Sequence, residues 1–248
     1  MTSPPPSVSM ASKPEPIASV AISPAILDAV CDHLQPTDEE RWPLLIGVIG
    51  HAGSGKTVFA EALRTHIDQS ISQLEVTMLH TDCYISVPRA VKNEMLRSMR
   101  DFAEYWQIFA VGPLAEDLDT LISRRNVRRT GLYSRATGAL DRVQHIDMES
   151  ERLQHRPVLV IAEGLMLVHP ELIQRFHRVI AIDQDPRVCL ERKIQRAGGY
   201  RPPEKTIHLF ENFEQPLVAD QWNRIIQLEK TIHLHQLRDG AFALEEQS

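Results

Sequence analysis

One stretch of the sequence has residue types and spacing suited to phosphate chemistry. It is Gly50-His51-Ala52-Gly53-Ser54-Gly55-Lys56-Thr57, which matches the P-loop pattern G-x-x-x-x-G-K-[ST]. In such a loop the glycines let backbone N–H groups surround phosphate oxygens, the lysine reaches the β and γ phosphates, and the hydroxyl ligates Mg²⁺. We therefore predict an ATP site made by Gly50, Gly53, Ser54, Gly55, Lys56 and Thr57, with Thr57 as a metal ligand. A glycine-rich turn that binds nothing is the alternative, but it gives no packing reason for this lysine and threonine.

Two acidic residues come directly after runs that we expect to be strands. Asp82 follows the predicted strand 75–80, and Glu163 follows the apolar strand 157–162. Ligands of open α/β sheets bind at the carboxyl ends of the strands, so both carboxylates are expected to face the P-loop. We predict that Asp82 takes the proton from an attacking hydroxyl, with a loop or helix-capping aspartate as the alternative. Glu163 is expected to hold Mg²⁺ with Thr57, as a Walker B acid does.

Two arginines on a predicted helix could grip phosphate oxygens. Asp185 and Pro186 are typical of a helix start, and Arg192 and Arg196 then lie on one helix face, four residues apart. Guanidinium groups suit phosphate oxygens, so we predict a catalytic role for both arginines. A glycine- and proline-rich segment follows, and we assign about residues 191–204 to a lid that closes over the site. An exposed basic helix face is the alternative.

Alternating strands and helices are expected to position these groups. Apolar runs predict strands at 44–49, 75–80, 157–162 and 178–183. A helix is expected after the P-loop because Phe59, Leu63 and Ile67 recur at helical spacing. This order predicts an α/β fold of the P-loop NTPase type, with a parallel sheet flanked by helices on both faces and a lid segment.

The chain divides into three predicted parts. Residues 1–20 are rich in proline and serine, so we expect a disordered N-terminal extension. Residues 21–40 are expected to form a helix and a linker, with Ser23 as helix cap and Pro24 as the first helical residue. Residues 41–248 are expected to form the P-loop domain.

Composition narrows the class of protein. The chain has 248 residues, of which 43% are apolar, and a formal net charge of −6, which gives no basic field for nucleic acid. Cys31, Cys83 and Cys189 fit neither a disulfide framework nor zinc spacing, so we expect a reducing, cytoplasmic location. No apolar stretch approaches membrane-spanning length and no secretory signal is expected, so no membrane partner is expected. A homo-oligomer is allowed.

Together these motifs resemble the uridine kinase/phosphoribulokinase family of P-loop kinases over about residues 44–201. The resemblance rests on the P-loop, on His80-Thr81-Asp82-Cys83-Tyr84, on the strand that ends in Glu163-Gly164, and on the helix that carries Arg192 and Arg196. It implies that Asp82 is the catalytic base, that Tyr84 is the aromatic residue at the substrate, and that the two arginines belong to the lid.

The resemblance also points to a substrate loop between the base and the strand that ends at Glu163. In this family a tyrosine-containing hairpin at that place helps to cover the acceptor, and residues 132–142 occupy it here. Tyr133, Arg135, Asp141 and Arg142 would offer stacking, anion binding and hydroxyl recognition. An ordinary β-hairpin with a Thr-Gly turn is the alternative.

The sequence therefore predicts an ATP- and Mg²⁺-dependent kinase for a hydroxyl of a small metabolite. Nucleosides such as uridine or cytidine are the leading acceptors, while glycerate, nicotinamide riboside, pantothenate and sugar phosphates stay open because specificity resides in variable loops. A nucleotide-binding regulator is the alternative, and it would need Lys56 and Thr57 but not Asp82. The N-K-x-D and D-x-x-G motifs of a GTPase do not occur in the sequence.

Overall fold

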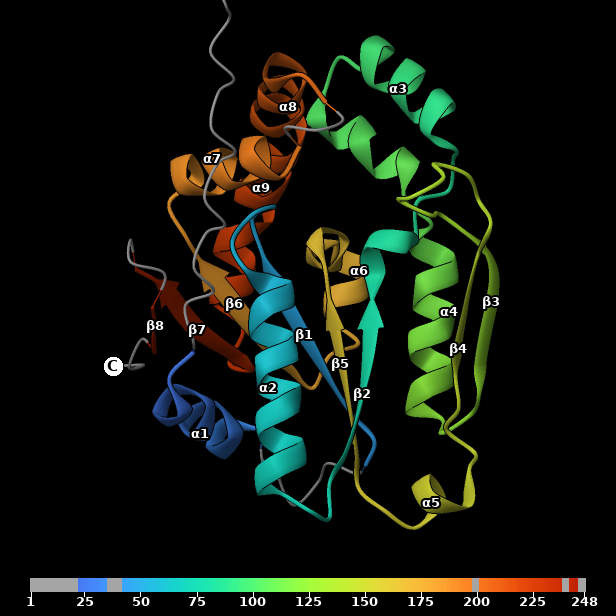
Figure 1. Ribbon diagram of the computed structural model, residues 1–248, viewed down its shortest axis with the longest axis vertical. Coiled ribbons are helices and arrows are strands. Elements are labelled where there is room, and N and C mark those ends of the chain that lie inside the picture. Colours follow the sequence, from blue (N-terminus) through green and yellow to red (C-terminus); the bar gives the residue numbers. More distant parts are fainter. Residues whose placement is uncertain (1–21, 35–41, 198–200, 238–240, 245–248) are drawn as a thin grey trace, which may run out of the picture.

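Six strands of the described residues form one mainly parallel sheet at the centre of the fold (Figure 1). The computed structural model describes residues 22–34, 42–197, 201–237 and 241–244. The strand order is β2-β5-β1-β6-β7-β8, in which β8 alone runs antiparallel to its neighbour. The strands are β1 Leu44–Gly50, β2 Glu75–His80, β5 Val158–Glu163, β6 Arg178–Asp183, β7 Thr231–Gln236 and β8 Phe242–Leu244. Val48 is in register with Glu163, so the ends of β1 and β5 lie side by side.

Helices cover both faces of the sheet because successive strand side chains point to opposite sides. On one face, α1 (Pro24–His33) and α2 (Lys56–Ser70) pack against Leu44 and Ile46 of β1. On the other face, α4 (Val111–Ile122), α6 (Pro170–Ile173) and α9 (Gln215–Ile226) pack in a cluster that includes Leu45 and Ile49. The strands are thus buried on both sides, which explains why each appears in the sequence as a nearly continuous apolar run.

A third group of elements lies beyond the carboxyl ends of the strands, at the upper end of the molecule in Figure 1. It consists of α3 (Arg89–Ser98), the 3₁₀ helix η2 (Phe102–Ile108), α7 (Pro186–Ala197), α8 (Pro203–Leu209) and the π-helix η4 (Phe210–Glu214). An apolar cluster joins η2, α8 and η4 through Tyr105, Ile108, Leu209 and Phe213, with Met95 and Leu96 of α3 packed against it. The elements around the predicted site therefore share a core of their own.

The segment between α4 and β5 forms a two-stranded antiparallel hairpin beside the main sheet. Its strands are β3 (Val127–Leu132) and β4 (Arg142–Ile146), and α5 (Glu151–Gln154) leads from it into β5. Two short 3₁₀ helices, η1 (Thr81–Cys83) and η3 (Leu165–Val168), follow directly after β2 and β5. The predicted substrate loop is therefore the connection between the two hairpin strands.

The predicted α/β architecture and the four predicted strands are confirmed, each to within one residue at either end. The sequence analysis did not assign β7 or β8, which extend the sheet beyond β6. Pro24 begins α1 as predicted, but the Ser23 side chain makes no capping hydrogen bond. The predicted extension at 1–20 and the centre of the predicted lid, at 198–200, lie outside the described residues.

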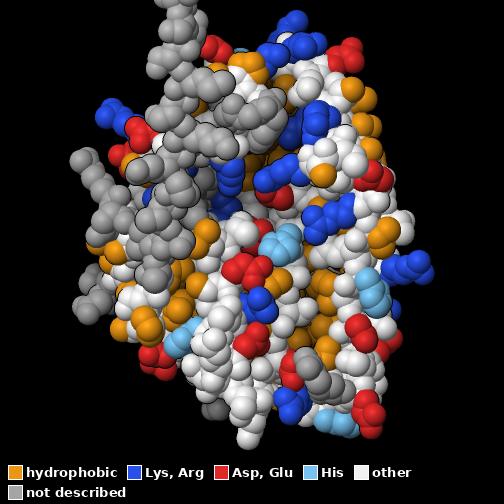
Figure 2. Space-filling model, viewed as in Figure 1, with side chains coloured by type: hydrophobic (Ala, Val, Ile, Leu, Met, Phe, Trp, Pro, Cys, Tyr) orange, Lys and Arg blue, Asp and Glu red, His pale blue; other side chains and the backbone are white. Residues whose placement is uncertain are grey.

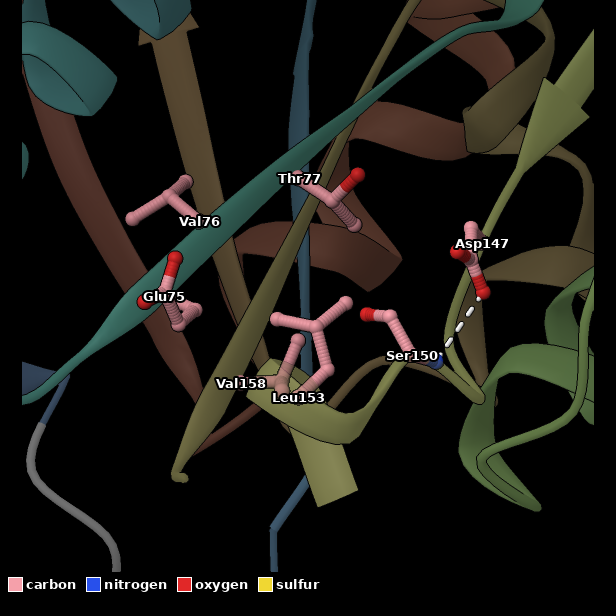
Figure 3. A pocket seen from close by; sticks show the side chains of 7 residues that line it. All are labelled: Glu75, Val76, Thr77, Asp147, Ser150, Leu153 and Val158. Atoms are coloured by element: carbon pink, nitrogen blue, oxygen red, sulfur yellow. Dashed lines mark hydrogen bonds between the residues drawn. The ribbon is translucent and has the colours of Figure 1, made fainter. Parts of the chain in front are cut away.

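A cavity of about 280 Å³ lies at the end of the sheet opposite the P-loop (Figure 3). It is bordered by the first residues of β2 and β5, Glu75 and Val158, and by Asp147, Ser150 and Leu153. Strand polarity places it away from the carboxyl ends where the predicted catalytic residues stand. Within the residues described, no helix is both long and apolar enough to cross a membrane.

Candidate active site

The P-loop connects the end of β1 to the start of α2 and lies directly against α7. Gly53 has φ of 100°, which glycine adopts readily and other residues rarely do. A Cβ atom at Gly53 would lie 2.4 Å from the backbone oxygen of Cys189 in α7. The close approach of these two backbones therefore requires glycine at this position.

Lys56 is buried within the P-loop that it closes. Its Nζ donates hydrogen bonds to the backbone oxygens of Gly50, at 3.0 Å, and His51, at 2.8 Å. Burial lowers the pKa of Lys56, while the carboxylates of Asp82 and Glu163 act in the opposite direction. The Ser54 hydroxyl is buried with no hydrogen-bond partner among the described residues. A buried ammonium and a free hydroxyl donor in one loop suit a phosphate group.

Glu163 joins the P-loop to the end of β2. Its Oε2 accepts a hydrogen bond from Thr57 Oγ1 at 2.9 Å, and its Oε1 lies 2.9 Å from His80 Nδ1. The hydrogen bond to Glu163 raises the pKa of His80, and Glu61, 3.5 Å from His80 Nε2, adds to the effect. Thr57 and Glu163 thus bring a hydroxyl and a carboxylate together, which is the donor set expected of a Mg²⁺ site completed by substrate phosphates. The role of Glu163 as a metal ligand stays a prediction.

Asp82 lies in η1, immediately after β2, with about half of its side chain exposed. Its Oδ2 accepts a hydrogen bond from Arg135 Nη2 at 2.6 Å, which makes an ion pair with the hairpin loop. His80 at the end of β2 is in register with Glu163 at the end of β5, so Asp82 lies at the same edge of the sheet as Glu163. From this edge the negative charge of Asp82 acts on Lys56.

Gly164 sets the spacing between the Glu163 and Asp82 segments. It has φ of 154°, and a Cβ atom there would lie 2.0 Å from Thr81 Oγ1, which donates to the Glu163 backbone oxygen at 3.0 Å. The pairing of glycine with glutamate at the end of β5 thus has a steric reason. It allows η1 to pack against the end of the strand.

Gly164→Ala is therefore expected to lower the free energy of unfolding by about 1–3 kcal/mol, because the new methyl group displaces Thr81 and strains the backbone. Urea unfolding followed by circular dichroism measures the loss. Gly112→Ala is the control, since nothing lies within 4 Å of its Cβ position at the start of α4, and it should be neutral or stabilising. Equal stability of the two variants would contradict the steric explanation.

The predicted substrate loop reaches the site through only some of its residues. The backbone N–H of Tyr133 donates to the Cys83 oxygen at 2.8 Å, and Arg135 meets Asp82. Asp141 and Arg142 are exposed, and Arg142 is close enough to His80 to lower its pKa. The hairpin predicted as the ordinary alternative is present, and it carries Tyr133 and Arg135 to the site.

Tyr84 needs a correction, because its side chain cannot touch an acceptor where it stands. It is fully buried, and its hydroxyl donates to Asp117 Oδ2 at 2.7 Å. Burial raises the pKa of Tyr84 far above its usual value. The ring fills the core beside α4, and the Asp117 carboxylate also binds Arg129 of the hairpin at 2.6 Å. Tyr84 therefore joins the hairpin to α4.

The two predicted lid arginines have different surroundings. Arg192 Nη1 lies 3.4 Å from the Gly53 oxygen and 2.5 Å from Gln236 Oε1, so it stands over the P-loop. Arg196, one turn later, is exposed, and its side chain makes no hydrogen bond or ion pair within the described part of the chain. Between them, Lys193 is buried and pairs with Glu214 of the π-helix η4. The structure thus brings Arg192 to the predicted nucleotide site and leaves Arg196 outside it.

Four groups at the site were missed by the sequence analysis: His80, Lys92, Tyr105 and the Lys193–Glu214 pair. His80 begins the segment that carries Asp82, but no feature of the neighbouring sequence shows that it binds a glutamate 83 residues later. Lys92 could have been found from the helical spacing of Arg89, Lys92 and Leu96, which places all three on one face of α3. Tyr105 donates to Glu214 at 3.4 Å, a pairing that only the fold reveals.

Comparisons with known proteins agree with this geometry. Among solved structures, a possible uridine kinase from Bacillus stearothermophilus is 18% identical, with a TM-score of 0.60 over 83% of this chain and 96% of that chain. D-glycerate 3-kinase from Cryptococcus neoformans var. grubii is 14% identical, with a TM-score of 0.54 over 86% and 92%. Phosphoribulokinase from Rhodobacter spheroides is 13% identical, with a TM-score of 0.52 over 79% and 72%. At these identities the likenesses show a shared fold.

The model of the phosphoribulokinase/uridine kinase family matches residues 45–204. This range is more than half of the 248-residue chain. It holds the P-loop, Asp82, Glu163 and the α7 arginines. The chain therefore belongs to the phosphoribulokinase/uridine kinase family, and it is a P-loop kinase that transfers a phosphoryl group to a hydroxyl of a small metabolite.

Proposed function

We propose that this protein transfers the γ-phosphoryl group of ATP to an acceptor hydroxyl that is deprotonated by Asp82. The single observation that carries the proposal is the meeting of Lys56, Thr57, Glu163 and Asp82 at the carboxyl ends of adjacent strands. Phosphoryl transfer needs little covalent help from the enzyme, so positioning and charge stabilisation are the main requirements. These four side chains supply both.

Each group has a distinct task in this scheme. The P-loop backbone and Lys56 bind the phosphates, and the ammonium offsets charge on the oxygens of the transferred group. Mg²⁺, held by Thr57 and Glu163, would neutralise phosphate charge when bound. Asp82 holds the acceptor hydroxyl in line and accepts its proton. Arg192, which already lies over the P-loop, binds a phosphate oxygen when the site closes.

The first test is a screen for acceptor-stimulated ADP release in the presence of ATP and Mg²⁺. Nucleosides, sugars, sugar phosphates and hydroxy acids are offered separately, and a kinase releases ADP only with a suitable acceptor. Uridine and cytidine remain the acceptors predicted from the sequence. A regulator that binds nucleotide without catalysis would show ATP affinity but no acceptor-dependent release with any compound. The expected cytoplasmic location remains a prediction and is consistent with three buried free cysteines.

Replacing the two predicted lid arginines one at a time should show which of them acts at the phosphate site. Arg192→Ala is expected to lower kcat roughly tenfold to a hundredfold, because it removes a charged hydrogen-bond donor from the phosphate site. Arg196→Ala should have a smaller effect, since that side chain is exposed and outside the site. Arg187→Ala, another exposed arginine at the start of α7, is the control. Steady-state kinetics decide the matter, and equal losses for Arg192 and Arg187 would remove Arg192 from the mechanism.

A further inference from the structure

Basic side chains of the hairpin loop and of α3 lie next to one another beside Asp82: Arg135 pairs with Asp82, and Arg89 donates a hydrogen bond to the Arg135 backbone oxygen. Figure 2 shows Lys and Arg side chains gathered around a hollow at the upper centre of the molecule, above α2 and below α3. We propose that the acceptor is an anion: it carries a carboxylate or phosphate group near the hydroxyl that is phosphorylated, and Lys92 and Arg135 bind that group. The proposal rests on the kinase function above and names the class of its acceptor.

The first support is the position of Lys92 on α3. Arg89, Lys92 and Leu96 fall on one face of this helix, and Leu96 packs against the apolar cluster that includes Leu209 and Phe213. At the start of the same face, Arg89 donates to the Arg135 backbone oxygen and, at 3.4 Å, to the Tyr133 hydroxyl. The basic face of α3 therefore runs from the hairpin loop to the wall made by α8 and η4.

The second support is a missing counter-ion. Burial lowers the pKa of Lys92 to about 8, while the negative charges of Glu214 and Asp82 act in the opposite direction. Glu214 is already paired with Lys193 and bonded by Tyr105, and Asp82 is paired with Arg135. Within the described residues, the Lys92 ammonium has no hydrogen bond or ion pair of its own. A partly buried ammonium without a partner is unfavourable, and an anionic group on the acceptor would supply the missing counter-ion.

The third support is the ion pair between Arg135 and the proposed base. Arg135 Nη2 lies 2.6 Å from Asp82 Oδ2, so a guanidinium stands beside the carboxylate that is to receive the proton of the acceptor. An anionic group on the acceptor would bind this guanidinium and so bring the neighbouring hydroxyl close to Asp82. A neutral acceptor offers Arg135 no charged partner.

The test compares acceptors with and without an anionic group on the same carbon skeleton. Glycerate is paired with glycerol, gluconate with sorbitol, and ribose 5-phosphate with ribose, with uridine as a further neutral compound. We expect kcat/KM to be at least tenfold higher for the anionic member of a productive pair, since a charged hydrogen bond contributes roughly a tenfold to hundredfold preference. The pairs also distinguish a carboxylate from a phosphate acceptor. Equal or better use of the neutral members would overturn the proposal.

Lys92→Met tests whether this lysine binds the anionic group, because methionine has a similar length and removes the charge. The KM for the anionic acceptor should rise roughly tenfold to a hundredfold, while the KM for ATP stays within about twofold. Lys205→Met, at an exposed lysine of α8, is the matched control and should leave both constants unchanged. An equal loss of ATP and acceptor binding in Lys92→Met would show that this lysine stabilises the fold or binds ATP, and it would contradict the proposed anion site.

A binding measurement tests the anion site without phosphoryl transfer, so its outcome can be distinguished from a failure of the proposed kinase function. With Mg²⁺ and a non-hydrolysable ATP analogue filling the P-loop, glycerate, gluconate and ribose 5-phosphate are tested for a rise in melting temperature. At least one should stabilise the wild type and not Lys92→Met, since a ligand that binds only the native state raises its stability. No ADP release with any acceptor would contradict the kinase function, while stabilisation by none of the anions would contradict the anion site.

Discussion

Lys56→Met is expected to lower kcat by about 10²–10³-fold, with the fold retained. The ammonium stands between two P-loop carbonyl oxygens, at 3.0 and 2.8 Å, in the place where the phosphates of ATP would be held. Because it is buried, its charge is little screened by water and acts strongly on the phosphoryl oxygens. Methionine fills a similar volume, so it suits this buried position better than alanine does.

The measurement for Lys56→Met is single-turnover phosphoryl transfer at saturating ATP, together with thermal unfolding of both proteins. A melting temperature close to that of the wild type shows that the loss is catalytic. Lys205→Met, whose lysine is exposed on α8, controls for the removal of a positive charge. Turnover near the wild-type value in Lys56→Met would contradict the kinase mechanism, since no other described lysine lies within the P-loop.

The parts of this site that the sequence predicted are those encoded locally. The P-loop specifies itself within eight residues, and Glu163 follows a strand whose burial on both faces makes it an apolar run. Asp82 could be placed because strand polarity brings the carboxyl ends of β2, β5 and β1 together. In each case a short sequence pattern has one structural consequence.

The parts that the sequence did not predict depend on pairings between distant segments. Glu214 meets Tyr105 only after η4 and η2 have packed around one apolar cluster, and it meets Lys193 only after α7 has come beside η4. Tyr84 shows the reverse error, because an aromatic beside the proposed base suggests substrate contact while the fold buries it against Asp117. A motif gives the order of residues, but it does not show which of their side chains point into the site.

The same limit applies to the acceptor. The family resemblance favours nucleosides, while the charges on α3 and on the hairpin loop favour an anion. The first inference transfers a property from relatives through loops that vary between them. The second rests on side chains of this chain, among them Lys92, which has no ion pair within the described residues, and the Arg135–Asp82 ion pair. Acceptor pairs with and without an anionic group separate the two inferences directly.

Asp82→Asn is expected to lower phosphoryl transfer by roughly 10²–10⁴-fold, the usual range for a positioned general base, while ATP affinity is unchanged. The substitution is nearly isosteric, and the amide oxygen can still accept a hydrogen bond from Arg135. The amide cannot take a proton from the acceptor hydroxyl. The nucleotide is held elsewhere, by the P-loop, Lys56 and Thr57, so a selective loss of turnover is the expected signature of the base.

The decisive experiment measures both ATP affinity and acceptor-stimulated ADP release for the wild type and for Asp82→Asn. Asp220→Asn is the control, since this aspartate is exposed on α9. Loss of ATP affinity without a specific loss of turnover would make Asp82 a metal or structural residue. Glu163 would then be the next candidate for the base. Its two oxygens already bind Thr57 and His80, at 2.9 Å each, and its side chain is buried. The Asp82 side chain is about half exposed, and among the described residues it is bound through Oδ2 alone, so Oδ1 is open to an acceptor hydroxyl. This difference is why we assign the base to Asp82.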